Sequence, residues 1–289
     1  MIQVGTSLHA IAGFGPPGKG FRQSVAEIAE CGYSHILLLA SESGPVVDET
    51  GTASGALVDI RRSDLQAVLR TVSSHGLRVS CVYPGMSLDF SQEGLDPTIA
   101  GLKVYRDIAW KLGCHVMVHS AGRSETPRMP LDRKKEQIAQ VAEAMNALAS
   151  DTHGEIFKMA VDIHYGGIIE TVADCEHLLT HTPNKNVGLC LNTGHMATLG
   201  EDGWTLLEHF PERIHVIAWK DHLVGDQLPK PVVSCQLGKG QTPFRKYVAA
   251  YRRVSRGALH LITFEDVPFD EKEEALRRSL EYFRSLFQG

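Results

Sequence analysis

The sequence predicts one (β/α)8 TIM barrel that occupies residues 1–289 as a single domain of the α/β class. Eight short apolar runs alternate along the chain with eight segments of helical spacing, which is the pattern of repeated βα units. The runs are almost continuously apolar, as strands of a parallel sheet buried on both faces must be. A length of 289 residues also suits a barrel, which typically needs about 250 residues.

The predicted strands are short runs of β-branched and aliphatic residues. They cover residues 2–7, 35–40, 77–82, 115–119, 157–164, 187–192, 213–220 and 258–265. The predicted helices place apolar residues three and four apart, and several end at a glycine such as Gly76 or Gly113. They cover residues 21–29, 65–72, 102–112, 138–148, 169–181, 204–210, 242–254 and 271–287.

A doubly wound open sheet is the structural alternative. It normally carries a glycine-rich phosphate loop after its first strand, but the glycines at 13, 15, 18 and 20 do not have GxGxxG spacing. In a barrel, the longer loops 41–60, 83–94, 120–131 and 222–241 all follow strands and share the carboxyl-end face, where catalytic residues collect.

Composition narrows the class of partner. There are 29 Lys and Arg against 34 Asp and Glu, a formal net charge of −5, which argues against nucleic acid as a partner. No apolar run approaches the roughly 20 residues needed to cross a bilayer, and MIQVGTSLHA lacks the basic start of a secretory signal. Six cysteines occur without a CxxC pair. We expect a cytoplasmic protein with no membrane partner.

Polar residues at the ends of apolar strands mark the candidate site. Side chains two apart on a strand share a face, so Asp162 and His164 point together, as do Met117 and His119. By the same parity, Lys220 follows Ala218 on its strand, while Asn192 and Glu265 end two others. Burying so many ionisable groups is costly unless they are paired, wetted or functional.

The segments that carry these residues make the chain similar to a known family. They are VDIHYGG (161–167), VGLCLNTGH (187–195), RIHVIAWKDH (213–222), LGKG (237–240) and TFED (263–266). In this order they resemble the sugar phosphate isomerase/epimerase superfamily of xylose isomerase-like TIM barrels. The glycines Gly238 and Gly240 are expected to permit a tight loop.

The resemblance implies one divalent metal, Mn, Mg or Zn, held by four strand-end ligands. Carried over by position, the ligands are Asp162, in place of the usual Glu, then Asn192 in place of Asp, and Glu265. The expected histidine falls on Ala218, which cannot bind a metal. An amide oxygen suits Mg²⁺ or Mn²⁺ better than Zn²⁺.

Three arrangements remain open for the missing ligand. Nearby histidines could complete a relocated metal site; they are His119, His164, His195 and His222. Alternatively, the Lys220 ammonium could itself stabilise a developing enediolate beside Asp162 and Glu265. Otherwise the barrel binds a sugar-like ligand without converting it, or is one half of a heteromeric enzyme.

The favoured hypothesis is an isomerase or epimerase acting on a small carbohydrate. Asp162 or Glu265 removes a proton next to a carbonyl, the opposite carboxylate returns it, and a metal or Lys220 holds the oxyanion. The same four histidines are the candidate substrate-binding residues, and His9 is a further candidate.

Three other functions compete with this one. The nearest is a lyase that dehydrates an inosose or acts on a keto-glycoside through the same enolate. The second is a catalytically silent sugar-binding subunit, which the alanine at position 218 favours. An apurinic-site endonuclease fits poorly, because it needs a multi-metal cluster and a basic surface. A homo-oligomer is also expected from the resemblance.

Overall fold

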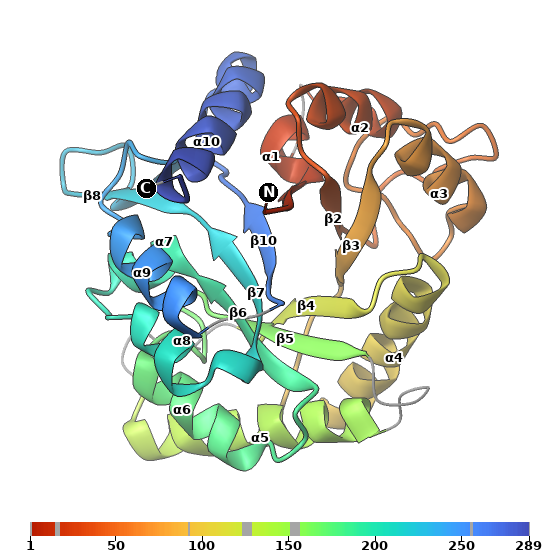
Figure 1. The fold of residues 1–289 in the computed structure, drawn as a ribbon. Helices are drawn as coiled ribbons and strands as arrows, with labels where there is room; N and C mark the ends of the chain where they lie inside the picture. The colour runs from red at the N-terminus through yellow and green to blue at the C-terminus, as the bar shows by residue number, and fades with distance from the viewer. Residues whose placement is uncertain are drawn as a thin grey trace.

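Eight parallel strands close into a barrel in this computed structural model, and the helices lie outside it (Figure 1). The structure describes residues 2–14, 18–91, 93–122, 129–150, 157–254 and 257–288. Around the barrel the strand order is β1, β10, β7, β6, β5, β4, β3, β2, and β1 pairs with both β2 and β10. The predicted TIM barrel is therefore confirmed, and a doubly wound sheet is excluded because no open edge remains.

The barrel strands match the predicted apolar runs to within a few residues. They are β1 (Val4–Ser7), β2 (His35–Leu39), β3 (Arg78–Tyr83), β4 (Val116–Ser120), β5 (Lys158–Asp162), β6 (Val187–Asn192), β7 (Ile214–Trp219) and β10 (Leu259–Ile262). Asp162 and Asn192 are the last residues of their strands, whereas Lys220 and Glu265 follow theirs.

The predicted helices bury one apolar face against the strands. They are α2 (Phe21–Glu30), α3 (Leu65–Ser74), α4 (Leu95–Lys111), α5 (Leu131–Ser150), α6 (Val172–His181), α8 (Trp204–His209), α9 (Phe244–Val254) and α10 (Lys272–Leu286). Trp219 shows how this outer layer is filled, since it is fully buried beside Phe244 and Phe283. No helix in the described part of the chain is both long and apolar enough to span a membrane.

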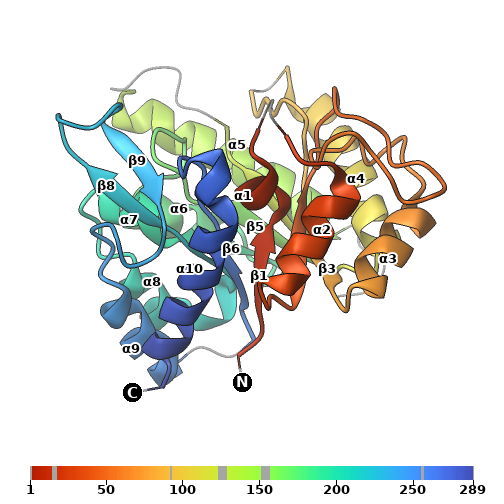
Figure 2. The ribbon, with the colours of Figure 1, turned by 90° about the horizontal axis from the view of Figure 1, so that it is seen from above.

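Two short α-helices and two short strands were not predicted. Helices α1 (Leu8–Ala12) and α7 (Thr193–Thr198) follow β1 and β6 directly and are too short to show helical periodicity. Strands β8 (Asp221–Val224) and β9 (Val232–Cys235) form an antiparallel hairpin where the sequence predicted a loop. In Figure 2 this hairpin stands beside α10, apart from the barrel strands. Of the predicted loop 120–131, residues 123–128 lie outside the described part of the chain.

Candidate active site

A cavity of about 250 Å³ opens at the carboxyl ends of the barrel strands. Its polar lining consists mainly of six side chains: His9, Asp162, His164, Asn192, Lys220 and Glu265. Its apolar lining includes Leu37, Leu39, Val118, Cys190, Ala218 and Leu261. The three predicted catalytic residues, Asp162, Lys220 and Glu265, therefore face one cavity. Asn192, the remaining predicted metal ligand, faces it too.

Strand register explains why residues from distant segments meet. Asn192 is paired with Ala218, and Asp162 with Cys190, so these four side chains point inward at neighbouring levels of the barrel. The alternation continues beyond the last hydrogen-bonded residue of β7, which brings Lys220 to the same side as Ala218.

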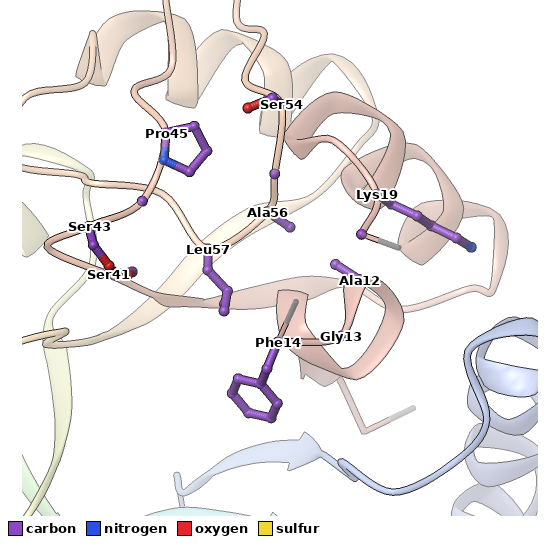
Figure 3. A pocket seen from close by; sticks show the side chains of 13 residues that line it. Ala12, Gly13, Phe14, Lys19, Ser41, Ser43, Pro45, Ser54, Ala56 and Leu57 are labelled. Atoms are coloured by element: carbon purple, nitrogen blue, oxygen red, sulfur yellow. Dashed lines mark hydrogen bonds between the residues drawn. The ribbon is translucent and has the colours of Figure 1, made fainter. Parts of the chain in front are cut away.

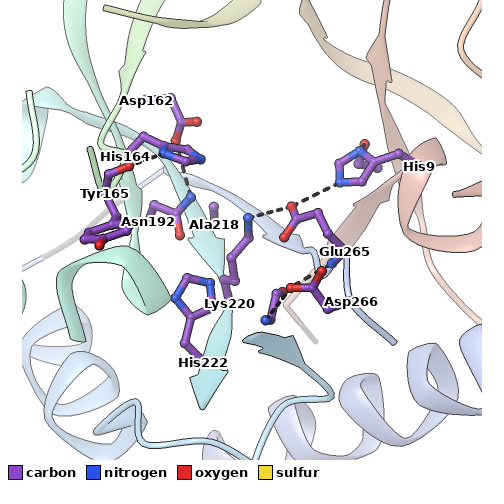
Figure 4. A network of polar contacts seen from close by, with 12 residues as sticks. His9, Asp162, His164, Tyr165, Asn192, Ala218, Lys220, His222, Glu265 and Asp266 are labelled. Carbon is purple, nitrogen blue, oxygen red and sulfur yellow. Dashed lines mark hydrogen bonds and ion pairs between the residues drawn. The ribbon is translucent and has the colours of Figure 1, made fainter. Parts of the chain in front are cut away.

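Two nitrogen atoms, from Lys220 and His9, lie near the same carboxylate oxygen of Glu265 (Figure 4). The Nζ atom of Lys220 donates to Oε1 at 2.6 Å, and Nε2 of His9 lies 3.4 Å from the same atom. Burial by itself would raise the pKa of the Glu265 carboxyl, but the charge of Lys220 and the His9 contact hold the pKa well below its usual range. Glu265 is therefore an anion at neutral pH.

The pKa of the Asp162 carboxyl is displaced in the opposite direction from that of Glu265. Asp162 is 9% exposed, and burial raises the pKa of its carboxyl in spite of the nearby His164 and Lys220. Its Oδ1 accepts a hydrogen bond of 3.4 Å from Nδ2 of Asn192, whose own Oδ1 is buried without a partner among the described residues. The cavity thus presents one carboxyl group with a raised pKa and one with a lowered pKa.

Three of the four predicted substrate-binding histidines form a cluster at the mouth. The ring centroids of His164 and His195 lie 3.8 Å apart, and those of His195 and His222 lie 4.7 Å apart. They line an outer cavity of about 560 Å³, which shares Phe14, His164 and Glu265 with the barrel cavity. Burial lowers the pKa of His222 to about 4 and that of His195 well below its ordinary value, so both rings are neutral at pH 7.

The prediction that His119 binds substrate is wrong. On β4 the side chain of Val118 lines the cavity, and Val118 is in register with Ala160 on β5. His119 therefore points to the opposite side, toward the helices, where it is fully buried and its Nδ1–H donates to the carbonyl of Ser120 at 2.9 Å. It lines neither cavity at the barrel mouth.

Asp221 organises the loop that follows the β8–β9 hairpin. Its carboxylate accepts backbone N–H bonds from Gly238 at 2.9 Å, Gly240 at 2.8 Å and Thr242 at 3.0 Å. A Cβ atom at Gly240 would lie 2.4 Å from Oδ1 of Asp221, and Gly238 has φ +84°. This confirms that the two glycines of the LGKG segment permit a tight loop, and it gives Asp221 a structural role.

A further cavity of about 330 Å³ lies beside the mouth (Figure 3). Mostly small residues line it, at positions 12–14, 18, 19, 41, 43–45 and 54–57. Its one charged lining residue among those described, Lys19, forms an ion pair with Glu27. The described residues that line this cavity include no acid–base pair, so the barrel cavity is the candidate site.

A divalent metal does not fit the side chains at the four expected positions. Ala218 provides no donor atom, and Lys220 places an ammonium on the Glu265 oxygen that a cation would have to approach. Among the described residues, no group of three or more His, Cys, Asp or Glu side chains is arranged to hold a metal ion. The relocated site based on histidines loses His119 because that side chain faces outward. The positive charge in the cavity is that of Lys220.

Comparisons with known proteins agree with this architecture. An inosose dehydratase from Geobacillus thermodenitrificans is 25% identical over 168 residues, which cover 55% of each chain. One from Clostridium perfringens is 28% identical over 127 residues, covering 40% of this chain and 42% of that protein. The chain thus spans about half the length of the curated relatives it matches.

Solved structures share the fold over nearly the whole chain. A D-allulose 3-epimerase from Methylomonas sp. superposes with a TM-score of 0.73 at 16% identity, covering 99% of this chain and 98% of the other. The IOLI protein, crystallised with a zinc atom, superposes with a TM-score of 0.72 at 14% identity, with coverage of 99% and 98%. The family model described as xylose isomerase-like TIM barrel matches residues 25–286. The chain belongs to the xylose isomerase-like TIM barrel family.

Proposed function

We propose that the protein is an acid–base enzyme that enolises a small polyhydroxylated carbonyl compound and then releases water from it. One observation carries this proposal: two carboxyl groups with oppositely displaced pKa values face a single cavity that also contains a lysine. Environments that separate the pKa values of two titratable groups assign one as the acid and the other as the base.

Glu265 is the general base in this proposal. It is ionised, and it removes the proton from the carbon next to the substrate carbonyl. Lys220 donates a hydrogen bond to the oxyanion that develops on the carbonyl oxygen, as a preorganised cation in a partly desolvated cavity does effectively. As Lys220 turns its charge toward that oxyanion, the Glu265 carboxylate becomes a stronger base.

Asp162 is the general acid. Its raised pKa favours the protonated form, which delivers a proton to the hydroxyl group on the neighbouring carbon. That C–O bond breaks, water leaves, and the enolate electrons form the new C=C bond. The curated relatives, inosose dehydratases at 25–28% identity, support elimination as the outcome.

Isomerisation or epimerisation is the second candidate. The two carboxyl groups reach the cavity from β5 and from the segment after β10, so a proton removed by one could be returned to carbon by the other. A structural neighbour is a D-allulose 3-epimerase, which acts by name on a ketose. The enolate and the role of Lys220 are the same in both reactions, which differ in where the second proton goes.

The test is proton exchange in D₂O with a panel of scyllo-inosose, D-allulose and D-fructose. We expect deuterium to enter one substrate, with loss of water detected by mass spectrometry if elimination follows. Glu265→Gln and Asp162→Asn should abolish product formation, whereas the outward-facing control His119→Gln should keep it. Deuterium exchange without water loss would favour the epimerase, and binding without exchange would leave a silent binding protein.

A further inference from the structure

We propose that His9, held by Ser7, is a positioning residue that fixes which oxygen of Glu265 acts as the base. The proposal rests on the proposed function, in which Glu265 removes the substrate proton. His9 and Lys220 both contact Oε1. Among the described residues no hydrogen bond to Oε2 is found, so Oε2 is the oxygen left for the substrate.

The local fold places His9 beside the base. Ser7 ends β1, and α1 begins at the next residue, so His9 lies in the first helical turn directly above the barrel. Its side chain lines the cavity, and the whole residue is 8% exposed. Phe14 stacks on the imidazole with 4.7 Å between ring centroids and 24° between planes, which fixes the tilt of the ring.

The contacts of His9 determine its tautomer. A neutral imidazole carries one N–H and one acceptor nitrogen. Nε2 lies 3.4 Å from Oε1 of Glu265 and makes no hydrogen bond to any described residue. Because a carboxylate can only accept, the tautomer with the proton on Nε2 is the one that suits this position. Nδ1 then accepts a hydrogen bond from the Ser7 hydroxyl, which lies 2.5 Å away. The Ser7 hydroxyl can also accept, so it is the Glu265 carboxylate that favours this tautomer, and Ser7 holds the ring in place through Nδ1.

The backbone of Glu265 is fixed independently of His9. Its N–H donates to Oγ of Ser234 at 3.2 Å, and its carbonyl accepts from Nζ of Lys272 at 3.1 Å. Only the side-chain torsions of Glu265 are then left to be restricted, and Lys220 and His9 lie where they can restrict them. Lys220 alone is one donor on a flexible stem, and a second donor on the same oxygen reduces the rotation of the carboxylate about its axis.

Three variants separate this role from simple packing. His9→Leu keeps the volume but removes the donor, and His9→Gln keeps an N–H near the position of Nε2. Ser7→Ala removes the hydroxyl that bonds to Nδ1 of His9. His119→Leu is the matched control, since His119 is also a buried histidine but faces away from the cavity.

We expect His9→Leu to lower kcat by about 10- to 100-fold with KM nearly unchanged, because a misplaced base impairs the chemical step more than binding. His9→Gln should recover most of the loss, and the control should behave as wild type. Equal losses in the Leu and Gln variants, or a loss confined to KM, would overturn the proposal.

A measurement made without substrate can test the role of His9 separately from the proposed enzymatic function. Long-range ¹H–¹⁵N correlation spectra of the wild type should show His9 as the Nε2–H tautomer, and Ser7→Ala should keep that tautomer because the Glu265 carboxylate favours it. An Nδ1–H tautomer in the wild type would refute the proposal even if the enzyme enolises its substrate. The expected tautomer in a protein without proton exchange would refute the proposed function alone.

Discussion

Lys220 and Glu265 form an ion pair in the barrel cavity, with 2.6 Å between Nζ and Oε1. The Lys220 side chain is 6% exposed, so little water screens its charge. Ala218, two residues earlier, lines the same cavity and leaves room beside this pair. The cavity therefore contains a fixed cation supplied by the chain itself, next to an ionised carboxylate.

Removing that cation should abolish turnover. Lys220→Met is expected to lower kcat by about 100- to 1,000-fold, the usual effect of losing an oxyanion-stabilising donor. Rates would be measured by product formation with the substrate that shows proton exchange. Lys239→Met, in the exposed part of the LGKG segment, is the control and should retain wild-type rates. A Lys220→Met enzyme as fast as wild type would remove Lys220 from the mechanism.

Metal removal should have little effect on the wild type. After dialysis against EDTA, activity should stay within about twofold of its starting value, since in the proposed mechanism Lys220 supplies the charge that stabilises the oxyanion. Restoring the ligands implied by the family resemblance should create a metal site. The triple variant Asn192→Asp, Ala218→His, Lys220→Met is expected to bind Mn²⁺ in calorimetry, whereas wild type is not. A chelator that stops turnover reversibly would contradict this prediction.

Asp162 should govern the alkaline side of the pH–rate profile. As a general acid it works when protonated, so kcat should fall as the pH rises through the raised pKa of its carboxyl. Asp162→Asn should lower kcat by about 100- to 10,000-fold and remove that limb from the remaining rate. The measurement is kcat from pH 5 to 9. A rate that instead rises through this pKa would make Asp162 the base.

Asp221 should matter for stability more than for chemistry. Asp221→Ala removes the acceptor of three backbone N–H groups, of which that of Thr242 is buried, and we expect the free energy of unfolding to fall by about 2 kcal/mol. Urea denaturation followed by circular dichroism measures this change. Asp226→Ala, an exposed carboxylate in the hairpin, should change stability by less than about 0.5 kcal/mol. Equal effects of the two variants would show that the loop does not depend on Asp221.

Buried histidines should make the protein sensitive to acid. Burial lowers the pKa values of His119, His215 and His260 to about 4, 3 and 4, against 6.5 when unfolded. The unfolded state therefore binds more protons below pH 6.5, and stability falls as the pH drops from 6.5 toward 4. His119 alone should cost about 3 kcal/mol by pH 4.

The measurement is urea unfolding between pH 7 and pH 4.5. His119→Gln removes one titrating group. The difference in bound protons between the unfolded and the folded state, which the slope of unfolding free energy against pH reports, should therefore decrease by up to one. An unchanged slope in this variant would show that His119 is already protonated in the folded protein.

Alternation along the strands predicted most of the site correctly. Four polar side chains face the cavity: Asp162, Asn192, Lys220 and Glu265. Each lies two positions after an inward-facing residue of the same strand or of its direct continuation. On β4 the same argument failed, since VMVHS is apolar at both parities and its sequence does not say which face is inward. The pairing of Val118 with Ala160 determines this, and it puts His119 outside.

The sequence alone determined the barrel, the strand ends at which polar groups gather, and the absence of a histidine at position 218. These features follow from local periodicity and residue type, which need no knowledge of distances. Only the tertiary structure decided that Lys220 contacts Glu265, that His9 shares the same oxygen, and that Asp162 and Glu265 have opposite pKa displacements. Those relations depend on closure of the barrel, which brings the first and last strands together and sets the burial of each charge.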